Sequence, residues 1–315
     1  MKSERGSGAE SEIVPKVREL IAEQPQSWPL LAAGLQGLRN RRERTVHAGP
    51  YEVAVRHIPH RIRSTTASID PADVAKRACF LCTANRPTEQ RGVPLSAEYS
   101  GYCNPFPIVE GHLTLIHNDH RWQTIAGEIG ALLDFAAILS GWLVIYNGAE
   151  CGASAPDHLH FQALPREEQG KAVFPLERTV RENGGRSISD EVRRIFVAQD
   201  TDRLRLIDRV EQLMSILMAL TGKQPEPMVN IAVFANPPGW TVCVFPRSRH
   251  RPSVFERGEL TVSPASVDLA GVFVVPQPAD FDRITGGHIA SIFDEITLSK
   301  DLFDAALRQW ESRSS

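Results

Sequence analysis

The chain has 315 residues, of which 42% are hydrophobic and 23% are charged, and its formal net charge at pH 7 is −3. This length is sufficient for one large domain or two medium domains with a sizeable core. The slightly negative charge and the lack of long lysine or arginine runs exclude the usual footprint of a nucleic-acid-binding protein.

Two sequence features bear on the compartment. Residues 1–11 are polar and contain no apolar core of a secretory signal, so we expect a cytoplasmic protein. Its five cysteines agree with a reducing compartment.

Residues 129–146 are apolar apart from Asp134, which is borderline for a membrane span. Gly130 and Gly141 interrupt that stretch, so we interpret it as a helix that runs into a short strand, with no membrane partner.

Hydrophobic spacing predicts a helical N-terminus, followed by strands interleaved with helices. Apolar residues recur at helical spacing over residues 1–45. The expected strands are 51–55, 112–117, 143–146, 158–164, 228–235, 240–246 and 271–275. The expected helices are 123–139, 203–220, 289–296 and 302–310. This alternation favours an α+β fold in which helices pack on a sheet.

Two histidines and a glutamine follow one another in the segment "DHLHFQAL". Residues i and i+2 of a strand share a face, so His158, His160 and Gln162 are predicted to point the same way. Buried imidazoles must be hydrogen-bonded or bound to a metal. The row is therefore either a solvent-facing strand or a reactive one. The preceding loop "YNGAECGASAP" favours the second interpretation, because small residues let backbone N–H groups approach an anion, and Asn147 and Ser154 add donors.

The second motif is the C-x-x-C pair Cys79 and Cys82. Such a pair is redox-active, structural or part of a metal site, and no strand precedes it as a thioredoxin-type site would require. A tetrahedral zinc ion needs two further ligands beyond two thiolates. The candidates are His112, His117, His120 and His158.

Two short basic segments complete the set of candidates. "PHRIRST" contains Arg61, Arg63 and Ser64, and "FPRSRHR" contains Arg247. Each segment is open to two interpretations, a solvated basic turn or a contact to phosphate. A strand that runs into a polar turn ending in His-Arg occurs both at 112–121 and at 242–251. This echo indicates two halves of similar architecture.

Three segments together, "CFLCTANRP", "FPIVEGHLTLIHNDH" and "GASAPDHLHFQ", resemble the histidine-triad superfamily. More narrowly they resemble its nucleotidyltransferase branch, in which H-x-H-x-Q replaces the H-x-H-x-H of the hydrolases. "HLHFQA" followed by "FPLE", and the tail "PASVDLAGVFVVPQPADFDRIT", are similar to the GDP-hexose phosphorylases of that branch. Galactose-1-phosphate uridylyltransferase and diadenosine tetraphosphate (Ap4A) phosphorylase are more distant in sequence. The resemblance spans residues 51–307.

The resemblance implies a histidine-triad-like antiparallel sheet with helices packed on it, built from two tandem halves that form one extended sheet. The implied divisions are an N-terminal helical segment (1–45), a catalytic half (46–200) and a second, non-catalytic half (201–315). The second half contains no H-x-H-x-Q of its own.

The resemblance also implies roles for single residues. His160 would be the nucleophile, and Gln162 would donate its amide to a phosphate oxygen. Because a third histidine there could protonate a leaving group and favour water, the amide favours transfer over hydrolysis. The implied substrate-binding residues are Asn147, Gly152, Ser154, Arg61, Arg63, Ser64 and Arg247. The implied ligands of a structural zinc ion are Cys79, Cys82, His120 and His158.

The implied reaction is GDP-hexose plus phosphate to GDP plus hexose 1-phosphate, by double displacement through a nucleotidyl-histidine intermediate. Inorganic phosphate or a sugar 1-phosphate is the acceptor, and a homodimer remains open. Within the same chemistry the alternatives are an Ap4A phosphorylase and a hexose-1-phosphate uridylyltransferase. A catalytically inactive, zinc-stabilised nucleotide-binding protein is the alternative of another class.

Overall fold

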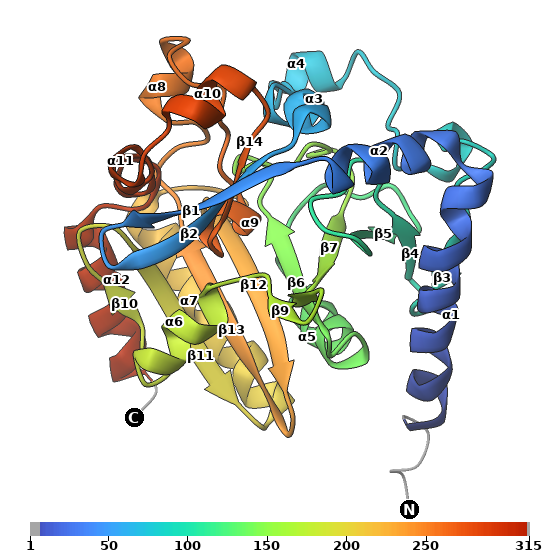
Figure 1. Ribbon diagram of the computed structural model, residues 1–315. Coiled ribbons are helices and arrows are strands. Elements are labelled where there is room, and N and C mark those ends of the chain that lie inside the picture. The colour runs from blue at the N-terminus through green and yellow to red at the C-terminus, as the bar shows by residue number, and fades with distance from the viewer. Residues whose placement is uncertain (1–6, 314–315) are drawn as a thin grey trace, which may run out of the picture.

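The computed structural model describes residues 7–313, so the first six residues of the expected helical segment lie outside the described part. Helices α1 (Ser7–Ser27) and α2 (Pro29–Arg39) come first (Figure 1). The chain then forms a hairpin of β1 (Arg42–Ala48) and β2 (Tyr51–His57). Residues 42–45, which we expected to be helical, therefore belong to a strand. Their polar sequence gave no strand pattern, and the pairing with β2 supplies the backbone hydrogen bonds.

Within residues 7–313 the central element is a nine-stranded sheet in the order β10-β11-β13-β12-β6-β7-β5-β4-β3. Every neighbouring pair in it is antiparallel. Its strands are β3 (Gly92–Pro94), β4 (Tyr99–Cys103), β5 (Leu113–His117), β6 (Trp142–Asn147), β7 (His160–Pro165), β10 (Ile188–Ser189), β11 (Arg194–Asp200), β12 (Val229–Asn236) and β13 (Gly239–Pro246). The α+β fold with one extended antiparallel sheet is therefore confirmed.

The sheet contains two repeats that meet between β6 and β12. In the first repeat β5 is followed by helix α5 (Ile129–Ile138), β6 and β7. In the second repeat β11 is followed by helix α7 (Arg203–Thr221), β12 and β13. Both repeats place their last strand between the other two, and β6 pairs with β12 with Asn147 opposite Asn230. By topology β13 corresponds to β7. The sequence similarity between 112–121 and 242–251 had instead matched β5 with β13, and that match is wrong.

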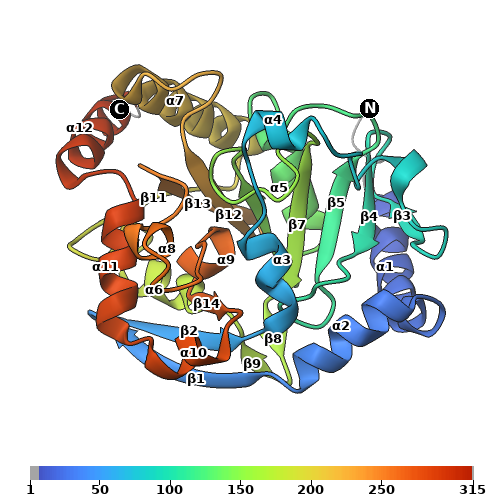
Figure 2. The same ribbon diagram turned by 90° about the horizontal axis from the view of Figure 1, so that it is seen from above.

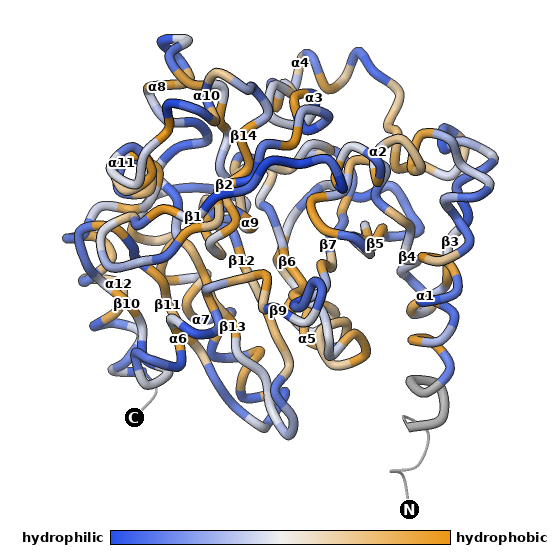
Figure 3. The backbone as a smooth tube through the Cα atoms, viewed as in Figure 1, coloured by the Kyte–Doolittle hydropathy of each residue, from blue (hydrophilic) through white to orange (hydrophobic). Residues whose placement is uncertain are grey.

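Helices cover one face of the large sheet. Helices α1, α5, α7 and α12 (Lys300–Ser312) pack an apolar core against the strands, with Leu132, Phe161 and Leu213 among its fully buried residues. In Figure 3 the hydrophobic stretches gather on the inner strands and on α5, whereas β1 is hydrophilic. The apolar stretch 129–146 is α5 followed by β6, and none of the described helices is long and apolar enough to cross a membrane.

A smaller sheet covers the other face (Figure 2). It has the order β1-β2-β14, and β14 (Val272–Val275) runs parallel to β2. Helices α9 (Ser266–Leu269), α10 (Pro278–Arg283) and α11 (Gly286–Ile296) complete a second apolar core with it. The remaining short elements are η1 (Pro59–Arg61), α3 (Ile62–Thr65), α4 (Pro71–Val74), η2 (Thr83–Asn85), β8 (Glu167–Glu168), β9 (Lys171–Ala172), α6 (Leu176–Glu182) and α8 (Ser253–Glu256).

The boundary expected at residue 200 falls at the end of β11, and β11 pairs with β13 of the second repeat. The large sheet is continuous across the two repeats, since β6 and β12 are hydrogen-bonded neighbours. The division of the chain into domains stays a prediction.

Candidate functional site

The site lies between the two sheets, at the end of β6 and the beginning of β7. Strand β7 begins at His160, two residues later than the spacing predicted, and the His158 N–H closes a turn onto the carbonyl of Ala155 at 3.1 Å. The Leu159 N–H binds the carbonyl of Arg121 at 2.6 Å instead of a strand partner. His158 is therefore outside the ladder, and the expected common face holds only for His160 and Gln162.

His160 is 4% exposed, and its Nδ1 lies 2.8 Å from the carbonyl oxygen of His158. Nδ1 must carry the proton to donate there, so the lone pair of the neutral ring is on Nε2. Within residues 7–313 no group is hydrogen-bonded to Nε2. Burial lowers the pKa of His160 to about 4, and the hydrogen bond to His158 opposes that shift. The neutral ring is thus fixed in one tautomer, with its lone pair on Nε2.

The backbone around His160 is fixed by Gln123, which sequence reasoning missed. Gln123 Oε1 accepts from the His160 N–H at 2.9 Å, and Nε2 donates to the carbonyls of His160 and Asn147 at 3.1 and 2.8 Å. The side chain is 3% exposed and joins β6 to β7 where the strands diverge. We expected Gln123 to start a helix, but α5 begins only at Ile129. A lone glutamine in a loop carries no sequence signal for such a role.

The side chain of Gln162 contacts His112, which was one of the candidate metal ligands. The Ile108 N–H points to His112 Nδ1 at 3.4 Å, so Nδ1 is the acceptor and Nε2 carries the proton. That Nε2–H donates to Gln162 Oε1 at 2.8 Å. Because the amide oxygen is occupied, the amide NH2 group is left for the cavity that Gln162 lines.

Cys79, Cys82, His120 and His158 come together into one cluster. Their ligand atoms all lie within 4.8 Å of one another, with Cys82 Sγ 3.1 Å from His120 Nδ1 and Cys79 Sγ 3.3 Å from His158 Nδ1. The His158 Nε2–H donates to the carbonyl of His117 at 2.8 Å, so its Nδ1 is the nitrogen free for a ligand. Two thiols and two imidazoles at these distances fit a tetrahedral metal ion.

The other two histidine candidates lie outside this cluster. His117 Nδ1 accepts from the Asp119 N–H at 3.0 Å, and His112 faces Gln162 as described. The Cys-x-x-Cys turn itself is closed by the Cys82 N–H on the carbonyl of Cys79 at 3.2 Å. The cluster could therefore hold a metal ion with four protein ligands.

A polar cavity opens beside Gln162. Five of the seven residues expected to bind substrate line it, namely Arg61, Ser64, Asn147, Gly152 and Ser154, together with Gln162. Hydroxyl, carboxamide and carboxylate groups that the sequence did not single out line it as well, from Thr65, Asn104, Ser263 and Asp268. The cavity is thus suited to a strongly polar ligand.

The charge in this cavity comes from Arg61 and Asp268. Arg61 Nη1 donates to the carbonyl of Phe106 at 3.2 Å, and burial lowers the pKa of the guanidinium to about 10. Burial raises the pKa of Asp268 to about 6, although the N–H groups of Val274 and Ala265 bind its carboxylate at 2.9 and 2.8 Å. A desolvated guanidinium in a polar cavity favours an anionic ligand.

Asn147 presents its amide in the same way as Gln162. Its Oδ1 accepts from Asn230 Nδ2 at 2.8 Å and from the Ser266 N–H and Oγ at 3.0 and 2.7 Å. Asn147 lines the cavity, so with its oxygen saturated the NH2 group remains available. Two neutral donors, on β6 and β7, therefore serve one polar cavity.

Two expected substrate residues lie elsewhere. Arg247 is 2% exposed, and its guanidinium donates to Asn230 Oδ1 and to the carbonyls of Ile296, Pro264, Arg249 and His250. The donors of the Arg247 guanidinium are all directed to groups of the second repeat, so Arg247 is connected to Asn147 only through Asn230. Arg63 is exposed on α3, and its guanidinium lies 6.0 Å from the ring centre of Phe106. Neither residue lines the cavity.

The cluster of Cys79, Cys82, His120 and His158 and the cavity are also linked. Arg77, close to the cysteine turn, donates from Nη2 to Asp157 Oδ1 at 2.8 Å and to the carbonyl of Ser154 at 3.4 Å. Asp157 is buried and adjoins His158. The turn that carries Cys79 therefore holds the loop that contains Ser154.

The chain thus has a histidine-triad-like fold, an extended antiparallel sheet of two repeats with His158 just before an inner strand and His160 at its first position. More particularly, residues 187–309 match the family described as GDPGP1-like, C-terminal domain, and residues 20–165 match a domain of unknown function, DUF4922. These matches and the fold confirm the resemblance stated from the sequence. No curated protein matches the chain in sequence.

Solved structures agree with this fold. Yeast Ap4A phosphorylase Apa2 superposes with a TM-score of 0.62 at 17% identity, over 90% of this chain and 97% of that one. The Apa2 complex with AMP gives a TM-score of 0.59 at 17% identity, covering 90% and 96% of the two chains. Its complex with Ap4A gives 0.55 at 16% identity, covering 90% and 97%.

Proposed function

We propose that the protein is a nucleotidyltransferase of the phosphorylase type, which converts GDP-hexose and phosphate to GDP and hexose 1-phosphate. The observation that carries the proposal is the neutral His160, with Nδ1 bound to a carbonyl, two residues before an amide that faces a polar cavity. The match of residues 187–309 to the GDPGP1-like C-terminal domain favours a GDP-hexose as the substrate.

The reaction consists of two displacements at the α-phosphorus. His160 Nε2 forms a bond to phosphorus, and the bond to the hexose 1-phosphate oxygen breaks, so that the electron pair leaves with the sugar phosphate. An oxygen of inorganic phosphate then forms a bond to phosphorus. The P–N bond breaks and its electron pair returns to Nε2. In the intermediate the ring carries positive charge, which the Nδ1–H bond to the carbonyl of His158 stabilises at 2.8 Å.

Catalysis of such transfers depends on positioning and charge stabilisation. The NH2 groups of Gln162 and Asn147 are suited to the nonbridging oxygens of the α-phosphate, and the Arg61 guanidinium supplies positive charge. Ser64 and Ser154 add hydroxyl donors. An amide at position 162 cannot protonate a leaving group as a third histidine could, and this supports transfer over hydrolysis.

We further propose that the Cys79, Cys82, His120 and His158 cluster holds zinc as a structural ion. The ion would fix the side chain of His158, and the carbonyl of the same residue anchors the nucleophile at 2.8 Å. Zinc would thereby stabilise the geometry of the site without taking part in the transfer.

A second candidate function is phosphorolysis of Ap4A, and the structural likeness to Apa2, including its complex with Ap4A, favours it. A hexose-1-phosphate uridylyltransferase would use the same two displacements with a sugar 1-phosphate as the acceptor. A zinc-stabilised protein that binds nucleotide without turnover is the alternative of another class.

Intact-protein mass spectrometry after mixing with GDP-glucose, UDP-glucose or Ap4A distinguishes these functions. A mass increase of one GMP with GDP-glucose alone, which phosphate then removes, would support the proposal. An increase of one AMP from Ap4A, or of one UMP that only a hexose 1-phosphate removes, would replace the substrate we propose. Binding without any acid-labile adduct would favour the inactive alternative.

A further inference from the structure

The loop before β5 is held through three consecutive backbone carbonyls, those of residues 106–108. Arg61 Nη1, His60 Nε2 and Arg56 Nη1 donate to these carbonyls in order, at 3.2, 3.0 and 3.1 Å. All three donors belong to the end of β2 or to the short helical turn that follows it. The small sheet therefore holds a loop of the large sheet at three successive peptide units.

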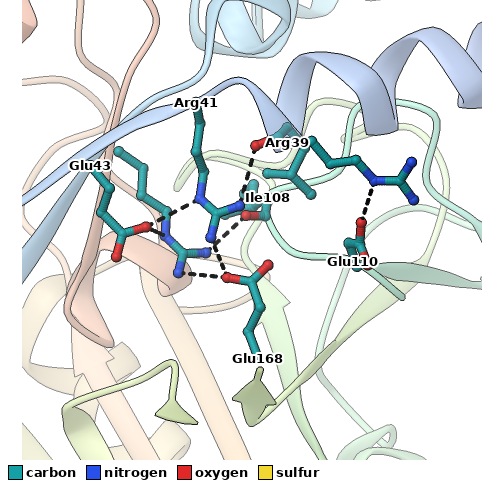
Figure 4. Close-up of polar contacts among 8 residues, drawn as sticks. Arg39, Arg41, Glu43, Ile108, Glu110 and Glu168 are labelled. Atoms are coloured by element: carbon teal, nitrogen blue, oxygen red, sulfur yellow. Dashed lines mark hydrogen bonds and ion pairs between the residues drawn. The ribbon is translucent and has the colours of Figure 1, made fainter. Parts of the chain in front are cut away.

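Arg56, which is 4% exposed, belongs to a charge-balanced cluster of two arginines and two glutamates. Its Nε lies 2.8 Å from Glu43 Oε2 and its Nη2 lies 3.1 Å from Glu168 Oε2. Arg41 pairs with the same two carboxylates, and Figure 4 shows Arg41, Glu43 and Glu168 around this point. Each of the four charges thus has two partners of opposite sign, which holds the buried Arg56 guanidinium in one orientation.

A chain of contacts runs from this cluster to the candidate site. Arg56 binds the carbonyl of Ile108, and the N–H of the same residue points to His112 Nδ1 at 3.4 Å. His112 then donates from Nε2 to Gln162 Oε1 at 2.8 Å. The loop thereby selects both the position and the tautomer of His112, and His112 selects which end of the Gln162 amide faces the cavity.

We propose that His112 is a positioning residue for Gln162, and that the cluster of Arg41, Glu43, Arg56 and Glu168 fixes His112 through the loop at residues 104–112. This inference rests on the proposed function, because it concerns the rate at which the nucleotidyl group leaves His160. His112 itself does not line the cavity. Its effect on the reaction is exerted through the Gln162 amide.

The chemical consequence concerns the second displacement. An acceptor oxygen bonds to phosphorus while the P–N bond breaks and its electron pair returns to His160. The Gln162 NH2 group is placed to donate to a nonbridging oxygen that gains charge in this step. If the Gln162 amide were rotated so that its oxygen and its NH2 group exchanged places, the oxygen would face that phosphate oxygen and repel it. Loss of the His112 contact should therefore slow transfer without weakening nucleotide binding by Arg61 or Asn147.

The test measures how fast phosphate discharges the nucleotidyl-enzyme, loaded with GDP-glucose and in parallel with Ap4A. His112→Phe removes the donor, and we expect discharge to slow on the order of 10- to 100-fold with nearly unchanged KM for the nucleotide. His112→Gln restores an amide donor and should recover part of the rate. Arg56→Lys should produce a smaller loss, because one ammonium group cannot replace the contacts of a planar guanidinium.

The control is an ion pair on the same loop that is not part of the chain of contacts. Arg39 Nε binds Glu110 Oε1 at 2.8 Å, and both side chains are at least half exposed. Figure 4 shows this pair apart from the cluster. Arg39→Gln should leave the discharge rate unchanged. If His112→Phe fails to fold, comparison of Arg56→Lys with Arg39→Gln carries the same test.

A wild-type protein that loads, with slow discharge in His112→Phe and partial recovery in His112→Gln, would support the inference. The inference would be overturned if His112→Phe discharged at the wild-type rate, or if Arg56→Lys and Arg39→Gln lowered the discharge rate equally. Either result would leave the proposed function intact. A wild-type protein that loads with neither nucleotide would overturn both.

Discussion

The two repeats of the large sheet differ most where their last two strands are joined. Residues 148–159 connect β6 to β7, and this connection contains Gly152, Ser154 and His158. In the second repeat only Pro237 and Pro238 connect β12 to β13. A tight hairpin leaves no backbone to approach a ligand, so the second repeat cannot form the same site at the equivalent place.

The facing pairs on the inner strands make the same contrast. Gln162 of β7 lies opposite Thr114 of β5, and Thr241 of β13 lies opposite Gln199 of β11. In the second repeat these two side chains bind each other, with Gln199 Nε2 donating to Thr241 Oγ1 at 2.9 Å. In the first repeat the glutamine binds His112 instead, which leaves its NH2 group free for the cavity. The two polar side chains thus bind each other in the second repeat, whereas in the first repeat the glutamine amide remains available to the cavity.

The second repeat contributes to the site from its opposite end. Asn230 at the start of β12 orients Asn147, and Arg247 after β13 holds Asn230. Ser266 completes the arrangement from α9. One repeat therefore supplies the groups that we propose take part in the reaction, and the other supplies part of their support.

The largest expected effect is the loss of the nucleophile. His160→Ala should abolish the nucleotidyl adduct and lower turnover by about 1,000-fold or more, because the other groups can only bind the substrate. Intact mass spectrometry with GDP-glucose and steady-state assays measure both quantities. His47→Ala, at an exposed position on β1, is the control and should behave as the wild type. An adduct that persists in His160→Ala would move the chemistry to another residue.

Removal of the metal should affect the first repeat selectively. Cys82→Ser should release bound zinc, lower the Tm and increase amide exchange over residues 148–159, while β11 to β13 stay protected. Metal content and hydrogen exchange by mass spectrometry measure these changes. Cys103→Ala changes a buried thiol outside the cluster and should retain the metal. Equal loss of protection in both repeats would contradict a local role for the ion.

An intermediate effect is expected where the second repeat supports the first. Asn230→Asp keeps an acceptor for Arg247 but cannot donate to Asn147 Oδ1, and it would place two oxygens against each other. We expect kcat to fall on the order of tenfold, with KM for the nucleotide changing less, since one positioned donor is disturbed. Steady-state kinetics measure the split between kcat and KM. Unchanged kinetics would mean that Asn147 needs no support from β12.

The smallest effect tests whether the second repeat is inert in catalysis. Thr241→Val removes the partner of Gln199, whose exposed amide can bind water instead, and should cost about 1 kcal/mol of unfolding free energy. Turnover should not change. Denaturant unfolding and a turnover assay measure the two quantities. A clear loss of turnover would show that this face of the second repeat takes part in the reaction.

The parts that could be predicted from the sequence are those encoded locally. Periodic apolar residues located β6, β12, β13 and α7, because burial of one face dictates the spacing. Strand β1 was missed, because its polar residues form a strand only through pairing with β2. The four residues of the Cys79, Cys82, His120 and His158 cluster were predicted as a set only through the resemblance to a known family.

The supporting contacts of the site could not be predicted. Gln123, His112 and Asn230 each bind a residue of the site that is distant in the chain, namely His160, Gln162 and Asn147 at 37, 50 and 83 positions. Nothing in their own neighbourhoods distinguishes them from ordinary polar residues of a loop or strand. Arg247 shows the converse, because a basic turn looks like a phosphate contact until its donors are found to bind backbone carbonyls.

The seam between β6 and β12 has a consequence for any attempt to divide the chain. Every residue of β6 is buried, and the strand has a neighbour on both sides. A fragment that ended after the first repeat would turn β6 into an open edge with an apolar surface, which invites edge-to-edge aggregation. The two repeats must therefore be made as one chain, because a fragment that contained only one of them could not form this sheet.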